Sequence, residues 1–176
     1  MIRIFLIASL IISNLILAEY TNSNGKALEK PFKDLIKWVR SDVEPKLAQI
    51  DVSSEWQTIN LNEADNYIIW IGHSTFLIKK KGITILTDPV FSDRASPFKN
   101  VGPERLIPPA MSIDQLPKID FVTVSHNHYD HLDINSLKQI FKLHSEAIFF
   151  VPIGDGKLLK RKRIRNVYEF NWWESY

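Results

Sequence analysis

The segment 125–133 (SHNHYDHLD) constrains this chain more than any other stretch. It gathers three of the five histidines and two aspartates into nine residues, directly after an apolar run. Imidazole and carboxylate groups are ligands that borderline divalent ions such as zinc accept. In an extended chain His126, His128 and Asp130 share one face, and His131 joins them only if the backbone turns there. We therefore predict a metal site where a strand opens through a loop into a helix.

Composition narrows the chemistry of that site. The 176 residues include no cysteine, so thiolate ligands and disulfides are excluded and a metal must be held by nitrogen and oxygen. A net charge of +2 gives no global attraction to nucleic acid, and we expect no nucleic-acid partner. The bulk numbers leave the oligomeric state open.

The N-terminus has the order of an export signal. Arg3 precedes the apolar run Ile4 to Leu17, and the small residue Ala18 follows it. This order predicts a signal peptide over 1–18, cleaved after Ala18, and a periplasmic or secreted protein. The alternative is an uncleaved N-terminal anchor, although the run is shorter than the ~20 apolar residues of a spanning helix.

Apolar periodicity divides the remaining chain into a lead-in with an amphipathic helix (19–65) and a domain (66–176). The amphipathic helix is expected over 31–41. Further helices are expected after the N-cap Asp133 and over 154–165, with a helical turn at 112–116 and a long loop over 90–109. Strands are expected at 67–71, 75–78, 83–87, 121–125, 147–151 and 167–170, the first of them buried on both faces. Antiparallel hairpins followed by alternating strands and helices predict an α/β (α+β) fold, a mixed sheet with flanking helices.

The density of ligand-type side chains favours two metal ions over one. A single His-x-His on a strand is often a packing feature, but Asp130 and His131 raise the count to four ligand types within six residues. His126 and His128 can share one ion while Asp130 and His131 reach a second. Two ions about 3.5–4 Å apart polarise a phosphoryl or carbonyl oxygen, which makes hydrolysis the natural reaction.

Several motifs in order carry a resemblance to a known family. The His126-x-His128-x-Asp130-His131 pattern resembles the signature of the metallo-β-lactamase superfamily, whose fold is an αββα sandwich. The whole set resembles the branch that includes N-acyl-phosphatidylethanolamine-hydrolysing phospholipase D and its bacterial relatives, over roughly 66–173. The other members of the set are WIGHST (70–75), LTDPVFS (86–92), RASP (94–97) and Gly102-Pro103-x-Arg105.

The resemblance implies a zinc-dependent phosphodiesterase-type hydrolase acting on a small-molecule or lipid phosphodiester. It places His126 and His128 on the first zinc, and Asp130, also the catalytic residue, with His131 on the second. Family members carry further histidine and aspartate ligands downstream, after a segment that Trp172-Trp173-Glu174 resembles. The expectation is therefore the N-terminal half of the sandwich, truncated, with a non-catalytic fragment holding an incomplete metal site as the alternative.

Three polar residues outside the cluster have supporting roles in this interpretation. Asp88 ends a strand, and we expect it to orient a ligand histidine. His73 follows Gly72 at a strand end, where the family pattern makes it a support for the site. His144 lies on the apolar side of its helix and is expected to be partly buried or capping.

The basic run 157–165 admits two interpretations. Its six lysines and arginines, with Leu158 and Leu159, can form the solvated outer face of a short helix or make peripheral contact with an anionic membrane. The sequence favours the solvated face.

Overall fold

The computed structural model describes residues 33–34, 36–37, 53–98, 100 and 102–175. The chain divides into two units, Met1–Ala48 and Gln49–Tyr176, and the sheet and the candidate site belong to the second. The predicted signal peptide lies outside the described residues. Of the helix predicted over 31–41, residues 33, 34, 36 and 37 are helical, and the others lie outside the described part. Within the described residues, no helix has both the length and the apolar character needed to cross a bilayer.

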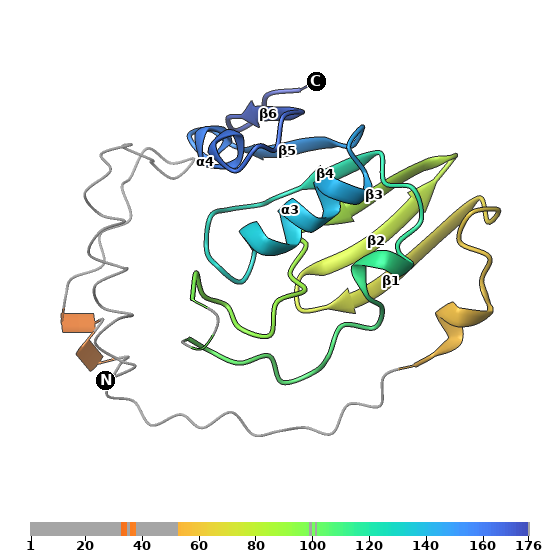
Figure 1. Ribbon diagram of the computed structural model, residues 1–176, viewed down its shortest axis with the longest axis horizontal. Coiled ribbons are helices and arrows are strands. Elements are labelled where there is room, and N and C mark those ends of the chain that lie inside the picture. The colour runs from red at the N-terminus through yellow and green to blue at the C-terminus, as the bar shows by residue number, and fades with distance from the viewer. Residues whose placement is uncertain (1–32, 35, 38–52, 99, 101, 176) are drawn as a thin grey trace. The chain divides into compact units, whose positions relative to one another are not determined.

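One six-stranded sheet forms the centre of the second unit, with its strands side by side in chain order (Figure 1). The first three strands are antiparallel neighbours, and the last four run parallel to one another. With its flanking helices, this mixed sheet confirms the predicted fold class. The strands are β1 (Asn66–Gly72), β2 (Thr75–Lys80), β3 (Ile83–Thr87), β4 (Phe121–Thr123), β5 (Ile148–Pro152) and β6 (Val167–Phe170).

The helices contribute to one buried core. The crossover β4–β5 contains α3 (Ile134–Leu143), and the crossover β5–β6 contains α4 (Gly156–Arg161). Figure 1 shows α3 lying against the sheet. Apolar side chains of both helices join the inward-facing strand residues in a single cluster. Short 3-10 helices η1 (Glu55–Thr58) and η2 (Ile113–Gln115) complete the described elements.

Helix boundaries follow local chemistry. As predicted, Asp133 caps α3, because its side chain accepts hydrogen bonds from the backbone N–H groups of Asn135 and Ser136. The helix predicted over 154–165 is shorter than expected and ends at Arg161. Arg163 then adopts a left-handed conformation with φ of 67°, which a continuing helix does not allow.

The opposite face of the sheet is also apolar, but it is open. Ile68, Ile78, Ile85, Phe121 and Ile148 are successive partners across five strands. Ile68 is 72% exposed, and the other four are half-buried. The prediction that 67–71 is buried on both faces is therefore wrong. Strand residues alternate between the two faces, and the described helices pack on only one of them.

This asymmetry predicts very different costs for two truncations within one sheet. Phe149 is fully buried, so Phe149→Ala should lower the free energy of unfolding by about 3–5 kcal/mol. Ile68→Ala on the open face should change it by no more than about 0.5 kcal/mol. Urea denaturation followed by circular dichroism measures both variants. Similar losses in the two would mean that the Ile68 face is packed in solution.

The loop 90–109 has no regular element in its described residues apart from an isolated bridge between Arg94 and Glu104. Arg105 secures it, because its guanidinium donates to the carbonyl oxygens of Val90, Ser92 and Ile107. Burial lowers the pKa of Arg105, and the nearby carboxylates of Asp133 and Asp93 oppose that shift. The loop is thus fixed beside the strand ends that carry the histidine cluster.

Candidate metal centre

Strand direction brings distant polar residues to one edge of the sheet. Because β3, β4 and β5 are parallel, the residues that follow them emerge at the same edge. These are Asp88, the ligand loop (defined as residues 125–131) and Asp155. β1 runs in the same direction as β3, so His73 joins this edge from the β1–β2 turn. The turn needs Gly72, whose φ is 139° and whose position leaves only 3.1 Å between an added Cβ and Arg105.

The ligand loop turns back on itself, as His131 requires. The backbone N–H of His131 donates to the carbonyl of His128 over 3.0 Å, which confirms the predicted turn. Before the turn, His126 Nε2 and His128 Nδ1 face each other 3.2 Å apart. The ring of His131 returns to within 4.0 Å of the His126 ring, measured between centroids. β4 itself ends at Thr123, two residues earlier than predicted.

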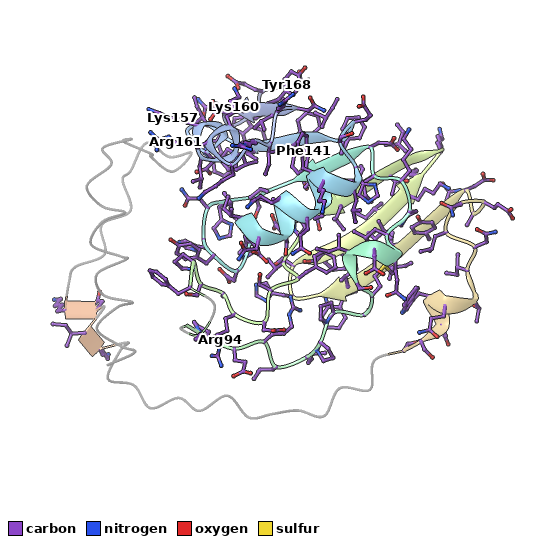
Figure 2. The ribbon with its side chains drawn as sticks, in the orientation of Figure 1. Arg94, Phe141, Lys157, Lys160, Arg161 and Tyr168 are labelled. Atoms are coloured by element: carbon purple, nitrogen blue, oxygen red, sulfur yellow. The ribbon has the colours of Figure 1, made fainter. Side chains whose placement is uncertain are left out.

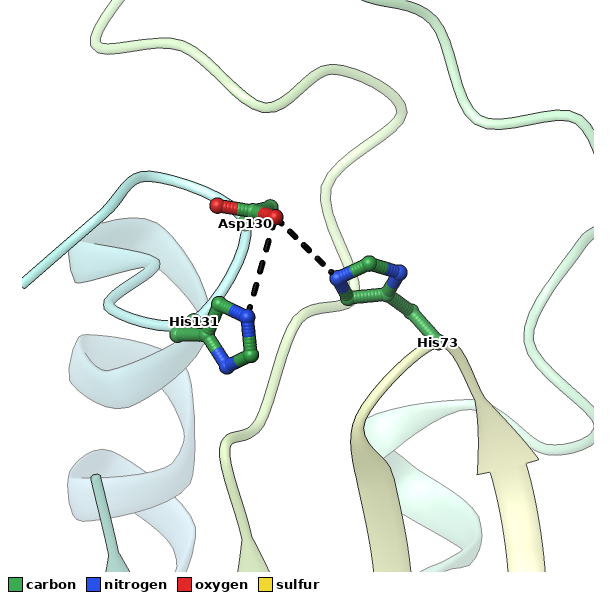
Figure 3. A group of neighbouring side chains, drawn as sticks. All are labelled: His73, Asp130 and His131. Carbon is green, nitrogen blue, oxygen red and sulfur yellow. Dashed lines mark hydrogen bonds and ion pairs between the residues drawn. The ribbon is translucent and has the colours of Figure 1, made fainter. Parts of the chain in front are cut away.

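A second convergence lies beside the first, as Figure 3 shows. Asp130 Oδ2 is 3.2 Å from His73 Nε2 and 3.7 Å from His131 Nε2. One ligand atom from each of these three residues falls within 4.8 Å of the other two. His73, expected to be a support, thus takes part in the same cluster as two of the predicted ligands.

Asp88 forms hydrogen bonds with residues at both ends of the ligand loop. It is buried, with 8% of its surface exposed, and adopts a left-handed backbone with φ of 35°. Its Oδ1 accepts from the Ser125 backbone N–H over 2.6 Å. Its Oδ2 lies 2.8 Å from the Ser125 hydroxyl and 2.9 Å from His131 Nδ1. One carboxylate therefore fixes both ends of the loop, and it contacts a predicted ligand histidine.

These contacts assign the tautomers of the neutral histidine rings. A carboxylate accepts, so His131 Nδ1 carries the hydrogen, and in the neutral ring Nε2 presents its lone pair towards Asp130. The Ser125 hydroxyl donates to Asp88, so its oxygen accepts from His126 Nδ1 over 2.9 Å. His126 Nε2 is then the unprotonated nitrogen facing His128. Asp88 thereby orients two histidines, one directly and one through Ser125.

The protonation state of His126 suits this arrangement. Burial lowers the pKa of His126, and the neighbouring His131 and His128 lower it further. Asp88 and Asp130 act in the opposite direction with smaller effects. A lowered pKa favours the neutral imidazole near neutral pH, and the neutral form is the one that binds a metal ion.

Comparison with known proteins agrees with this geometry. Residues 67–172 match the family described as the β-lactamase superfamily domain. The chain belongs to this superfamily. The match covers most of the region over which the metallo-β-lactamase resemblance was recognised, and that recognition is confirmed.

Three curated relatives of this superfamily chain are informative. It is 42% identical over 119 residues to an N-acyl-phosphatidylethanolamine-hydrolysing phospholipase D of Caenorhabditis elegans, covering 65% of this chain and 33% of the relative. It is 38% identical over 109 residues to a mitochondrial protein of the same description from Saccharomyces cerevisiae, covering 62% and 23%. It is 35% identical over 66 residues to a metal-dependent hydrolase of Caldivirga maquilingensis, covering 38% and 23%. The chain spans a third or less of the length of each.

In this superfamily chain, one hydrogen bond of the ligand loop was not predicted from the sequence. Asn127, between the two facing histidines, donates through Nδ2 to Asp155 Oδ1 over 3.1 Å. Asp155 is buried three residues after β5, at the N-cap of α4, and burial raises its pKa, an effect that the Asn127 hydrogen bond opposes. These residues lie 28 positions apart, and a polar residue after a buried strand was the only available signal. The middle of the ligand loop is therefore tied to the next strand.

His144 lies far from the cluster. It forms the C-cap of α3, which starts near His131 and is ten residues long, or about 15 Å. Its Nε2 is buried without a hydrogen-bond partner among the described residues. His144 is thus half-buried and capping, as expected from the sequence.

His144 should make stability depend on pH. Burial lowers its pKa below the 6.5 of an unfolded chain, so the unfolded state binds its proton more readily. The penalty is absent well above pH 6.5 and grows as the pH falls through that value towards the folded pKa. Urea midpoints between pH 7.5 and 5.5 should fall less in His144→Gln than in the parent protein. Identical slopes would contradict this role for His144.

Proposed function

We propose that this chain carries the metal-binding edge of a zinc-dependent phosphodiester hydrolase. The observation that carries the proposal is the convergence of two ligand pairs, His126 with His128 and Asp130 with His131. Each pair presents nitrogen or oxygen atoms within 3.2–3.7 Å of each other. Neutral imidazoles and carboxylates are suitable ligands for zinc, so the residues present fit two such ions.

The residues of the proposed site have two kinds of role, metal binding and positioning of the metal ligands. His126, His128, Asp130 and His131 would hold the ions, and the Asp88–Ser125 pair keeps the ligand nitrogens unprotonated. Divalent ions bound there supply Lewis acidity that polarises a phosphoryl oxygen and makes water more acidic. Asp130 is the catalytic residue in this proposal, because its exposed carboxylate can accept a proton beside the reacting atoms.

The substrate class in this proposal is a lipid or small-molecule phosphodiester. Support comes from the C. elegans and S. cerevisiae relatives, whose descriptions name a phospholipid substrate. It also comes from the loop 90–109, where Leu106 is 59% exposed next to the anchored Arg105. An exposed apolar side chain on this loop suits an acyl-bearing substrate. We also propose that the protein is exported, because the apolar run Ile4 to Leu17 has the order of a signal peptide.

A second candidate function is a metal-binding unit without turnover. It is favoured by the ligand count, because the predicted set gives each ion two protein ligands. Catalytic zinc sites generally use three protein ligands and keep one position for water or substrate. Two-ligand sites would complete their shells with water and bind weakly.

Calorimetric titration of the 176-residue protein with zinc, paired with an assay on bis(p-nitrophenyl) phosphate, decides between these functions. Two bound ions and turnover that chelation abolishes would support the hydrolase. Binding without turnover would favour the second candidate. Failure to bind zinc, cobalt(II) or manganese(II) would reject both.

A further inference from the structure

A strongly basic surface lies on and after α4. We define the basic surface as Lys157, Lys160, Arg161, Lys162, Arg163 and Arg165. All six side chains are exposed. Figure 2 shows Lys157, Lys160 and Arg161 projecting from α4 away from the sheet. The chain as a whole carries a net charge of only +2, so the residues outside this surface are net negative.

The charges of this surface are not neutralised locally. No acidic residue occurs between Gly156 and Tyr168. Of the flanking acids, Asp155 is buried, and Glu169 uses its carboxylate to accept the backbone N–H groups of Gly154 and Gly156. None of the ion pairs found among the described residues involves one of the six cations. The connection between α3 and β5 contacts Asn166 through the carbonyl oxygen of Ser145. It carries one exposed acid, Glu146.

The fold holds this surface rigidly. Leu159 and Ile164 are fully buried and anchor the helix and its following turn to the core. Leu158, between Lys157 and the next cations, instead remains 38% exposed. An exposed apolar side chain beside cations of the same helix is typical of a helix that lies at a membrane surface.

We propose that the basic surface docks this protein onto bilayers that contain anionic phospholipid. Clusters of four to eight lysines and arginines attract anionic headgroups, and this surface has six, three on α4 and three directly after it. Leu158 would reach the boundary of the acyl region. Single-stranded nucleic acid, whose bases stack on aromatic rings, is the competing partner, because Tyr168 is exposed shortly after these residues. The exposed apolar side chain among the cations is the aliphatic Leu158, which favours the bilayer. This inference is independent of metal binding. If the proposed function also holds, the Asp155–Asn127 hydrogen bond links the start of α4 to the ligand loop.

Vesicle sedimentation with the 176-residue protein tests the docking. One vesicle set is pure phosphatidylcholine and the other contains about one third phosphatidylglycerol. The difference in bound protein between the two vesicle sets measures the electrostatic contribution to binding, because apolar binding by other regions contributes to both. We expect at least about tenfold stronger partitioning onto the anionic vesicles, weakened by raising the salt from 0.1 to 0.5 M.

Two matched triple variants test whether the basic surface is responsible for binding to anionic vesicles. Lys157→Glu/Lys160→Glu/Arg161→Glu should reduce anionic partitioning at least about tenfold. Lys80→Glu/Lys138→Glu/Lys142→Glu makes the same change in net charge at exposed positions elsewhere and should reduce it less than about threefold. Circular dichroism confirms that both remain folded. Equal losses, equal binding to both vesicle types, or displacement from anionic vesicles by an equal mass of RNA would overturn the proposal.

Discussion

Replacing Asp88 by alanine is expected to destabilise the protein by about 3 kcal/mol and, under the proposed function, to weaken zinc binding about 10–100-fold. The destabilisation follows because this buried carboxylate accepts from the Ser125 N–H, the Ser125 hydroxyl and the His131 ring. Alanine leaves these donors without their partner at a largely buried position. The loss of affinity follows because neither His131 nor His126 would keep its orientation.

Asp88→Asn should separate these two effects. The amide oxygen can still accept the Ser125 N–H, so much of the stability should remain. The amide nitrogen, however, is a donor where His131 Nδ1 and the Ser125 hydroxyl also donate. His131 would then move its hydrogen to Nε2, the nitrogen that faces Asp130, and lose its ligand lone pair.

Cobalt(II) absorption titration and urea denaturation measure the two quantities in parallel. Asp65→Ala, at an exposed position before β1, serves as the control and should change neither by a measurable amount. If Asp88→Asn binds cobalt as tightly as the parent protein, Asp88 does not set the histidine tautomers.

The sequence predicted those parts of the fold that depend on local signals. β6, the cap at Asp133 and the hairpin of β2 and β3 all rest on residues within a few positions of one another. The failures needed information from elsewhere in the chain. Apolar residues on both faces of β1 could not show that Ile68 lies on an open face. The early end of β4 reflects the capture of the Ser125 N–H by Asp88, 37 residues away.

The candidate site divides in the same way. The cluster 126–131 was recognisable because its members are adjacent in sequence, and Asp88 because it ends a strand. The Asn127–Asp155 hydrogen bond joins residues at the ends of neighbouring parallel strands, a relation that exists only once the strand order is known. His73 approaches Asp130 across 57 residues for the same reason. The ligand-type residues and the role of Asp88 were thus predicted from the sequence, whereas the contacts of Asn127 and His73 required the strand order.

Asp130→Ala should differ from Asp88→Ala, because it should keep the stability of the fold while losing metal binding and hydrolysis. The Asp130 side chain is 44% exposed, and its contact with His73 is an exposed pair. Such pairs contribute about 0–1 kcal/mol, so the free energy of unfolding should barely change. In the proposed function, however, Asp130 is the carboxylate of the second ion. Its removal should cost more affinity than the 10–100-fold expected for an outer partner.

The stoichiometry of bound metal and the rate of hydrolysis test this variant together. We expect the parent protein to bind two ions and Asp130→Ala to retain one, held by His126 and His128, with hydrolysis at the uncatalysed background. Tyr129→Phe is the matched control, because it changes an exposed neighbour in the same loop and should leave both measurements unaltered. If Asp130→Ala still binds two ions, His73 and His131 alone hold the second one, and the assignment of Asp130 as its ligand is wrong. If it binds one ion and retains full turnover, Asp130 is a ligand without a catalytic role.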